Sequence, residues 1–133
     1  MSDVVGPDKV GWVLIRDRRL LVGRNEGRSA FYLPGGGRDE GETDVETLVR
    51  EIDEELSVAI DPTTARHVAT VIARRDESEH DIVYIAYTAE HEGEPVPSAE
   101  VEELAWVSTA DGAAVTDAER RLMAILRDRD LID

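Results

Sequence analysis

The part of the chain best suited to chemistry is an acidic segment that begins in a run of three glycines. Between Gly36 and Glu55 there are nine Asp or Glu residues and only two Arg residues. Carboxylates at this density repel one another unless water or cations neutralise them, and divalent cations that do so also attract phosphate groups. The segment therefore suggests metal-assisted chemistry on a phosphorylated ligand, although a well-solvated acidic helix explains its composition equally well.

Spacing within this segment predicts an amphipathic helix. Thr43 and Glu46 have the spacing of a capping box, so the helix is expected to start at Thr43. An apolar stripe then recurs at helical intervals, in Val45, Leu48, Val49, Ile52 and Leu56. Glu51, Glu54 and Glu55 share an arc of about 100° beside that stripe. Their carboxylates can therefore converge on a cation next to the core, although acidic residues on the solvent face of a helix are also common.

The other elements needed to position this helix are short strands and a second helix. Apolar and β-branched runs predict strands over 10–15, 20–22, 31–33, 67–73, 82–89 and 104–107. A loop is expected at 34–37, where glycines let the backbone approach a ligand. A C-terminal helix should run from Thr116 to about Asp130, because Thr116 and Glu119 repeat the capping-box spacing. This element order predicts a mixed α/β fold in one domain over 1–133.

Composition narrows the functional classes. The chain has 15 basic and 30 acidic residues, which disfavours binding to nucleic-acid polymers or to anionic membrane surfaces. It has no cysteine, which excludes disulfides and thiolate chemistry and is compatible with a cytoplasmic location. No apolar stretch approaches the ~20 residues that span a bilayer, and no signal peptide is expected in 1–9.

The spacing around the predicted helix resembles the Nudix box. That signature is Gly, five residues, Glu, seven residues, Arg-Glu, an aliphatic residue, any residue, Glu-Glu, any residue, Gly and an aliphatic residue. Eight of its nine fixed positions match between 36 and 58, at Gly36, Glu42, Arg50, Glu51, Ile52, Glu54, Glu55 and Val58. The departure is Ser57 in place of glycine, which puts the geometry of the helix exit in doubt but removes no carboxylate.

The resemblance implies an α/β/α sandwich with a mixed sheet and a Mg²⁺-dependent hydrolase, with Mn²⁺ as a possible substitute. By resemblance, the metal ligands are Gly36 through its carbonyl, Glu51, Glu54 and Glu55. Arg50 is expected to orient the glutamates by ion pairing. The general base is expected to be one of these glutamates or an acid from a later loop, and Glu51 is the preferred candidate over Glu54. By the same comparison, Glu42 supports the loop.

Residues outside the box are weaker candidates for substrate binding. Arg24 leaves a strand just before a glycine-containing loop and could contact a phosphate, or could be an ordinary surface arginine. Tyr32 could stack on a base, as could Phe31, Tyr84 and Trp106, although aromatic residues in short strands usually belong to the core. Arg28 is a weaker candidate than Arg24. The acidic residues at 100, 102 and 103 could add a metal ligand or form a solvated turn.

The expected activity is cleavage of a nucleoside triphosphate, possibly an oxidised one, to a monophosphate and pyrophosphate. The short chain resembles the small MutT-like branch of the family. Nucleotide sugars and dinucleoside polyphosphates remain alternative substrates, and a non-catalytic nucleotide sensor is an alternative of another class. Homodimers are common in the family, so a homodimer is possible here.

Overall fold

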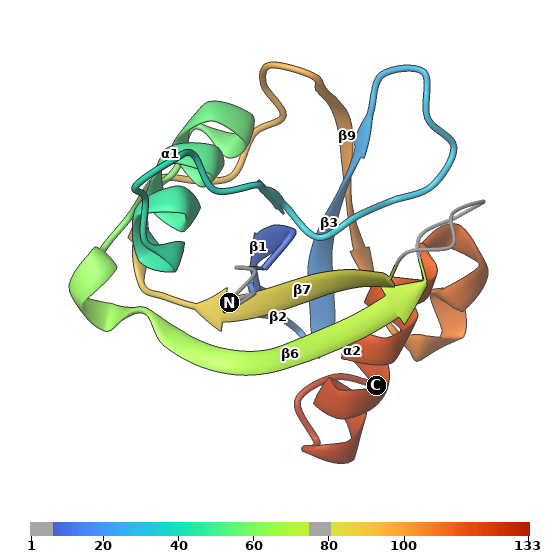
Figure 1. Cartoon of the computed structure of the whole chain (residues 1–133). Coiled ribbons are helices and arrows are strands. Elements are labelled where there is room, and N and C mark those ends of the chain that lie inside the picture. The colour runs from blue at the N-terminus through green and yellow to red at the C-terminus, as the bar shows by residue number, and fades with distance from the viewer. Residues whose placement is uncertain (1–6, 75–80) are drawn as a thin grey trace.

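The computed structural model of the chain describes residues 7–74 and 81–133 (Figure 1). Its strands are β1 (Lys9–Trp12), β2 (Ile15–Arg16), β3 (Arg19–Asn25), β4 (Gly35–Gly36), β5 (Ala59–Ile60), β6 (Arg66–Arg74), β7 (Asp81–Thr88), β8 (His91–Glu92) and β9 (Val101–Val107). Its helices are α1 (Asp44–Leu56), α2 (Asp117–Asp128) and the short 3₁₀ turns η1 (Pro62–Thr64) and η2 (Thr109–Ala114).

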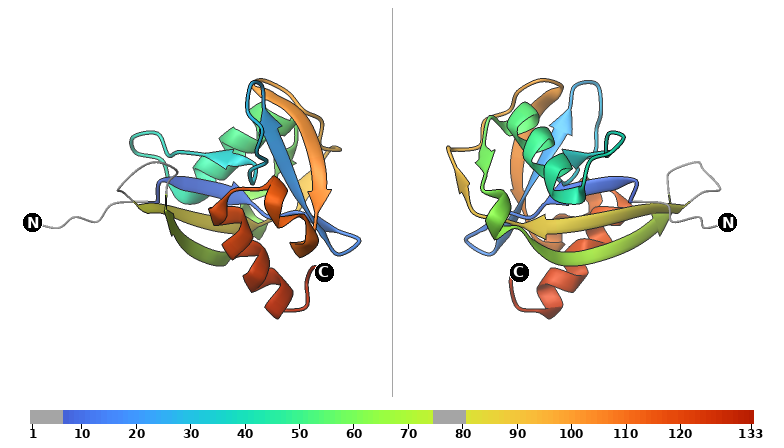
Figure 2. Two further views of the ribbon diagram at one scale, coloured as in Figure 1. Left: turned by 90° about the vertical axis from the view of Figure 1, so that its right-hand side faces the viewer. Right: turned by 60° about the vertical axis from the view of Figure 1, so that its left-hand side comes forward.

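The strands form a mixed arrangement, as predicted. One sheet has the order β4-β1-β7-β6, in which β1 and β7 are parallel and the other neighbours antiparallel. A second sheet has the order β2-β3-β9, and β5 pairs with β8. Helix α1 covers one side of the strands and α2 the other (Figure 2). The α/β/α sandwich expected from the sequence is therefore confirmed.

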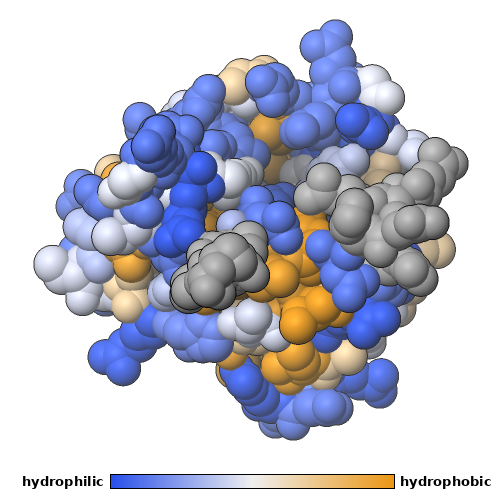
Figure 3. Space-filling view, viewed as in Figure 1, coloured by the Kyte–Doolittle hydropathy of each residue, from blue (hydrophilic) through white to orange (hydrophobic). Residues whose placement is uncertain are grey.

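Two apolar clusters fill the spaces between these layers. The cluster under α1 contains Trp12, Leu48 and Ile52, all fully buried. The cluster under α2 contains Leu122 and Leu126 and extends to the opposite faces of β3, β6 and β7. On the outer surface, apolar side chains gather over β6 and β7 and are surrounded by hydrophilic ones (Figure 3).

Several predicted strand boundaries were wrong. The expected strand over 31–33 is reduced to two isolated bridges, one of which joins Tyr32 to Gly23, while the expected loop at 34–37 contains β4. The expected strand over 10–15 is divided into β1 and β2, and β9 starts at Val101 instead of residue 104. Most of the polar connection expected between β6 and β7 lies outside the described residues.

The two helix starts differ in a way that matters for the site. At α1 the capping box is formed, because the Thr43 hydroxyl accepts from the Glu46 N–H and the Glu46 carboxylate accepts from the Thr43 N–H. At α2 the expected capping box is absent, since the Thr116 hydroxyl donates to the Glu119 carboxylate instead of accepting a backbone N–H. Glu119 is thereby turned into the protein, where it is 1% exposed.

Helix α1 ends at Ser57 in the left-handed conformation that glycine usually supplies. Ser57 has φ 55° and ψ 39°, and its N–H donates to the Asp53 carbonyl at 3.0 Å. The last carbonyls of α1 also accept hydrogen bonds from Val96 N (3.0 Å) and from the Ser98 N–H and hydroxyl (2.9 and 2.7 Å). The segment 96–98, which we call the capping strap, therefore satisfies groups that a helix end normally leaves unpaired.

This exit predicts that Ser57→Gly stabilises the protein. Glycine adopts positive φ without the steric cost that a side chain carries, so the free energy of unfolding should rise by about 0.5–1 kcal/mol. Urea denaturation followed by circular dichroism measures the change, with Ser98→Gly as the opposite control because it removes the hydroxyl that caps α1. A decrease for Ser57→Gly would mean that the serine side chain itself holds the exit.

Candidate active site

The arginine of the box is the centre of an ion-pair network at the start of the site. Arg50 Nε and Nη2 donate to the two carboxylate oxygens of Glu42 at 2.7 and 2.8 Å. Its Nη1 donates to Glu51 Oε1 at 2.7 Å, and Nη2 also reaches the Gly37 carbonyl at 3.1 Å. Arg50 thus joins the glycine strand, the loop before α1 and one glutamate of the helix, which is the arrangement expected for an orienting residue.

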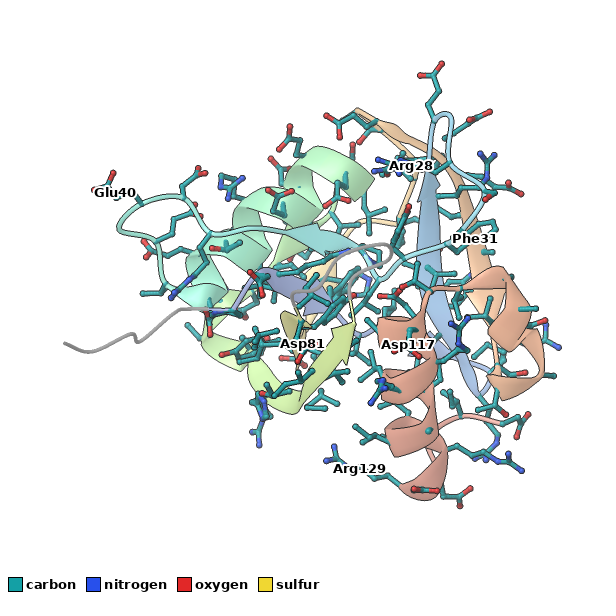
Figure 4. All side chains as sticks on the ribbon, turned by 45° about the vertical axis from the view of Figure 1, so that its right-hand side comes forward. Arg28, Phe31, Glu40, Asp81, Asp117 and Arg129 are labelled. Atoms are coloured by element: carbon teal, nitrogen blue, oxygen red, sulfur yellow. The ribbon has the colours of Figure 1, made fainter. Side chains whose placement is uncertain are left out.

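Glu42 has the contacts of a support for this loop. Besides Arg50, the Asp39 N–H and the Thr47 hydroxyl donate to its carboxylate at 2.8 and 2.9 Å. These hydrogen bonds, those from Arg50 first, lower the pKa of Glu42 to about 2. The Glu42 carboxylate is therefore ionised at neutral pH. In the loop between Gly37 and Glu42, Glu40 points away from the protein into solvent (Figure 4).

The two glycines of β4 bring the backbone against the helix carboxylates. Gly36 pairs with Val10 of β1, and a Cβ added at Gly36 would lie 2.5 Å from the Glu51 carboxyl carbon. A Cβ added at Gly35 would lie 2.0 Å from the Val10 carbonyl oxygen, and Gly35 has φ +149°. Glycine is thus required at 36 by the position of Glu51 and at 35 by the neighbouring strand.

Glu55 lies next to β4. Its carboxylate accepts a hydrogen bond from the Gly35 N–H at 3.1 Å. Burial and the nearby Glu51 carboxylate raise the pKa of Glu55 to about 8, although Lys9 and the Gly35 N–H oppose the shift. Two carboxylates held this close, one of them partly buried, favour either a shared proton or a bound cation.

The glutamates fit a divalent cation in part. Within 7–74 and 81–133, no three acidic or histidine side chains are close enough to form a complete cation site. Glu51 and Glu55 are brought together, whereas Glu54 is exposed on the next part of the helix surface. Hard oxygen ligands are the ones that Mg²⁺ prefers, and one or two protein carboxylates completed by water and substrate phosphates are a common site for it. The donor set therefore suits a cation that arrives with its substrate.

A cavity of about 520 Å³ opens next to this pair, and Glu55 and Gly35 form part of its wall. Its size is within the range of small-molecule sites. Tyr32, which the sequence suggested as a substrate-binding residue, lines it, and so does Tyr84. Arg28, from the loop after β3, and Asp117, from the start of α2, approach this region from opposite ends (Figure 4).

Arg24 lies elsewhere. It is not among the residues that line the cavity, and its guanidinium reaches Glu102 and Glu103 at 3.4 and 3.1 Å. Its Nη1 donates to the Arg28 carbonyl at 2.9 Å, so Arg24 braces the loop that carries Arg28. Arg28, which the sequence ranked below Arg24, is therefore the arginine that lines the cavity.

Two cavity residues were not predicted from the sequence. Lys9 is half-buried, and its ammonium lies over the rings of Tyr84 and Tyr32 at 5.3 and 5.5 Å from their centroids. Burial lowers the pKa of Lys9, while Glu119, Glu55 and, more weakly, Glu51 oppose the shift. Lys9 is the one lysine among the 15 basic residues, a signal that was available in the sequence.

Glu119 is the second unpredicted residue, and it is almost completely buried. One carboxylate oxygen accepts from the Thr116 hydroxyl, and the other has no hydrogen-bond partner among the described residues. It lies beside the Tyr84 hydroxyl, and burial together with this carboxylate raises the pKa of Tyr84 well above its usual range. The spacing of Glu119 from Thr116 predicts a capping box, and so does not predict that its carboxylate is buried at the cavity.

Several solved structures share the fold of this chain. It resembles a MutT NUDIX hydrolase from Burkholderia pseudomallei (27% identity over 90% of this chain and 97% of that one, TM-score 0.75). It also resembles the ORF135 protein of E. coli (22% identity, 92% and 89%, TM-score 0.73) and a putative nudix hydrolase family member from Chromobacterium violaceum (21%, 96% and 80%, TM-score 0.75). No match was found among curated proteins.

The sandwich fold and its glutamate helix thus define a hydrolase that acts on phosphorylated small molecules. A model of the NUDIX domain matches residues 7–126, and the chain belongs to that family. Nudix hydrolases act on nucleoside diphosphate-linked substrates and generally use divalent metal ions. Within the described part of the chain, no helix is long and apolar enough to cross a membrane.

Proposed function

We propose that this chain is a Mg²⁺-dependent pyrophosphohydrolase that cleaves a nucleoside triphosphate to a monophosphate and pyrophosphate. The observation that carries the proposal is the place of Glu55, which belongs both to the glutamate pair and to the wall of the cavity. A nucleoside held in the cavity would direct its phosphates past β4 toward Glu51 and Glu55. The nucleoside and the reacting anhydride then occupy adjoining parts of one site.

The chemistry is hydrolysis of a phosphoanhydride. Water attacks one phosphorus, the bond from that phosphorus to the bridging oxygen breaks, and the bridging oxygen leaves with the other phosphate. A bound cation would neutralise the phosphate oxygens that otherwise repel the nucleophile. Glu51 is our candidate to accept the proton of the water, because Arg50 holds its carboxylate in place beside Glu55.

The other chain groups have supporting roles in this proposal. Glu55 would provide a ligand oxygen together with the Gly36 carbonyl, and Glu54, which is exposed on the next part of the helix surface, would have to turn toward them to join the ligand set. Tyr32 provides aromatic surface for the base, and Tyr84, which is 3% exposed, supports the cavity wall from the interior.

The proposal is tested by measuring pyrophosphate and phosphate release from nucleoside triphosphates, nucleotide sugars and dinucleoside polyphosphates. We expect turnover of a nucleoside triphosphate that EDTA abolishes and Mg²⁺ restores. Glu54→Gln should lower kcat by about 100-fold or more. Asp53→Asn is the matched control, because Asp53 is an exposed acid on the same helix outside the proposed site.

The alternatives correspond to distinct outcomes. Turnover confined to a nucleotide sugar or a dinucleoside polyphosphate would replace the substrate but retain the metal site. Nucleotide binding without turnover of any compound would favour a sensor. Equal losses in Glu54→Gln and Asp53→Asn would contradict the assigned role of Glu54.

A further inference from the structure

The fold directs the side chain of Lys9 into the cavity. Lys9 starts β1 and pairs with Tyr84 of the parallel strand β7. Successive residues of a strand face opposite sides, so Val10 packs in the cluster under α1, while Lys9 and Gly11 face Tyr84 and Leu33. The chain uses arginine at its 14 other basic positions, so this cavity wall carries its one primary amine outside the N-terminus.

The ammonium of Lys9 has hydrogen-bonding capacity to spare. A lysine ammonium has three N–H donors and no acceptor. Among the described residues it forms no ion pair within 4.0 Å and no hydrogen bond; its close neighbours are the faces of the Tyr32 and Tyr84 rings. Aromatic faces attract a cation but leave its donors unused. A ligand in the cavity can therefore supply the missing acceptors.

The Glu119 carboxylate stabilises the charged ammonium of Lys9 in the cavity wall. This carboxylate is on the α2 side of Lys9, and Glu55 is on the β4 side. At 1% exposure, Glu119 is sealed behind Tyr84 and Thr116 and offers little surface to a ligand. The carboxylate thus supplies negative charge from behind, while the ammonium is the polar group that a ligand would meet.

We propose that Lys9 is a substrate-binding residue that donates a hydrogen bond to an oxygen of the bound nucleotide, and that Glu119 is its positioning residue. This inference rests on the proposed function, because it assumes that the cavity holds the nucleotide. The oxygen is a carbonyl of the base or a phosphate oxygen, since Lys9 lines the cavity and also lies near Glu55 of the glutamate pair. Both present an acceptor to the same ammonium.

The single lysine allows a direct test. Protein labelled with ¹³C in lysine and tyrosine gives one Lys9 Cε–Hε signal together with the ring signals of three tyrosines. Uridine, cytidine, pyrophosphate and UMP are titrated separately with Mg²⁺ present; none of them contains the triphosphate that the enzyme is proposed to cleave. The tyrosine rings report whether each compound enters the cavity, and the Lys9 signal reports whether it meets the amine.

The compounds distinguish the two sources of oxygen. A Lys9 shift with either nucleoside but not with pyrophosphate would identify an oxygen of the nucleoside. A shift with uridine that is weaker with cytidine would assign it to the C4 carbonyl of the base, which cytidine lacks. A shift with pyrophosphate or UMP but not with either nucleoside would identify a phosphate oxygen. Movement of tyrosine signals with a constant Lys9 signal for all four compounds would overturn the proposal.

Kinetics provide an independent measurement on the intact enzyme. Lys9→Met should lower kcat/KM by roughly 10- to 100-fold, the usual effect of losing a hydrogen bond to a charged group, and Lys9→Arg should restore part of it. Arg127→Met removes the same charge from the exposed face of α2 and should leave kcat/KM unchanged. Equal kinetics for Lys9→Met and native protein would contradict the proposal.

Glu119→Gln tests the positioning role separately. It should move the Lys9 signal in the ligand-free protein and reduce its response to nucleotide, a spectroscopic change that a purely structural role of Glu119 would not produce. A melting curve verifies that the variant is folded. If no compound is hydrolysed but Lys9 still responds to nucleotides, the proposed hydrolysis fails and this site stands. If a compound is hydrolysed but the Lys9 signal does not respond to any nucleotide, the proposed hydrolysis stands and the proposed role of Lys9 fails.

Discussion

Gly36→Ala is expected to lower kcat for the preferred substrate by about 100-fold, the loss that follows when a catalytic group is misplaced by about 1 Å. An added Cβ would lie 2.5 Å from the Glu51 carboxyl carbon and 2.7 Å from both of its oxygens. The obstructing atoms are the end of a flexible side chain, so Glu51 can rotate away while the backbone stays in place. The variant should therefore fold normally and lose activity.

Gly37→Ala is the matched control for this prediction. A Cβ at Gly37 meets only the Asp8 carbonyl at 3.5 Å, an ordinary contact. Steady-state kinetics and thermal melting of the two variants, measured together, separate activity from stability. Native activity in Gly36→Ala would show that Glu51 does not need its present position, and a large loss of stability would show that the backbone had to move.

The neighbouring glycine should behave in the opposite way. Gly35→Ala would place a Cβ 2.0 Å from the Val10 carbonyl and 2.7 Å from Gly11 Cα, at a φ of +149°. These are backbone atoms of β1, so the β1–β4 pairing must separate. We expect the free energy of unfolding to fall by roughly 3 kcal/mol or more, a magnitude that is typical of backbone strain combined with lost packing.

Chemical denaturation measures this loss. Gly112→Ala is a suitable reference, because its Cβ would meet only Arg120 side-chain atoms at 3.6 and 3.7 Å and its φ is not positive. If Gly35→Ala is as stable as Gly112→Ala, β4 can rearrange without cost and does not fix the position of the site. Greater loss for Gly36→Ala than for Gly35→Ala would reverse the roles assigned to the two glycines.

Local patterns in the sequence predicted the helix that carries the glutamates. Thr43 and Glu46 are three residues apart, and the capping box that they form depends on nothing outside the helix. The apolar stripe likewise placed Leu48 and Ile52 in the core, where both are fully buried. These interactions lie within a few residues, so spacing alone is sufficient to predict them.

The cavity could not be predicted in this way, because its residues come from elements far apart in the sequence, among them β1, β4, β7, α1 and α2. Which of two neighbouring residues in a strand faces a ligand depends on the register of that strand, and a shift of one residue reverses it. The two arginines were ranked for another reason: Arg24 was preferred because it precedes a glycine-containing loop. Its guanidinium instead pairs with Glu102 and Glu103, and the loop brings Arg28 to the cavity. Glu119 was interpreted as a cap because spacing does not show whether a side chain turns toward its own helix or toward the interior.

Some expectations stay predictions. They are the roles of Arg50 and of the individual glutamates, the carbonyl of Gly36 as a ligand, the choice of Mg²⁺, the single domain over 1–133, the homodimer and the cytoplasmic location. The enzyme class and the family are shown by the NUDIX family model, which matches residues 7–126.

The capping strap has a consequence for how such proteins are recognised. Because residues 96–98 hold the last carbonyls of α1, the left-handed exit at Ser57 is maintained by a segment about forty positions further along the chain. Glycine at the exit then makes the left-handed backbone easier to adopt, but the glutamates of α1 do not need it to keep their positions. A sequence signature that requires this glycine would miss related chains in which a distant segment stabilises the end of the helix. A signature that scores the glutamates and leaves the exit open would retain them.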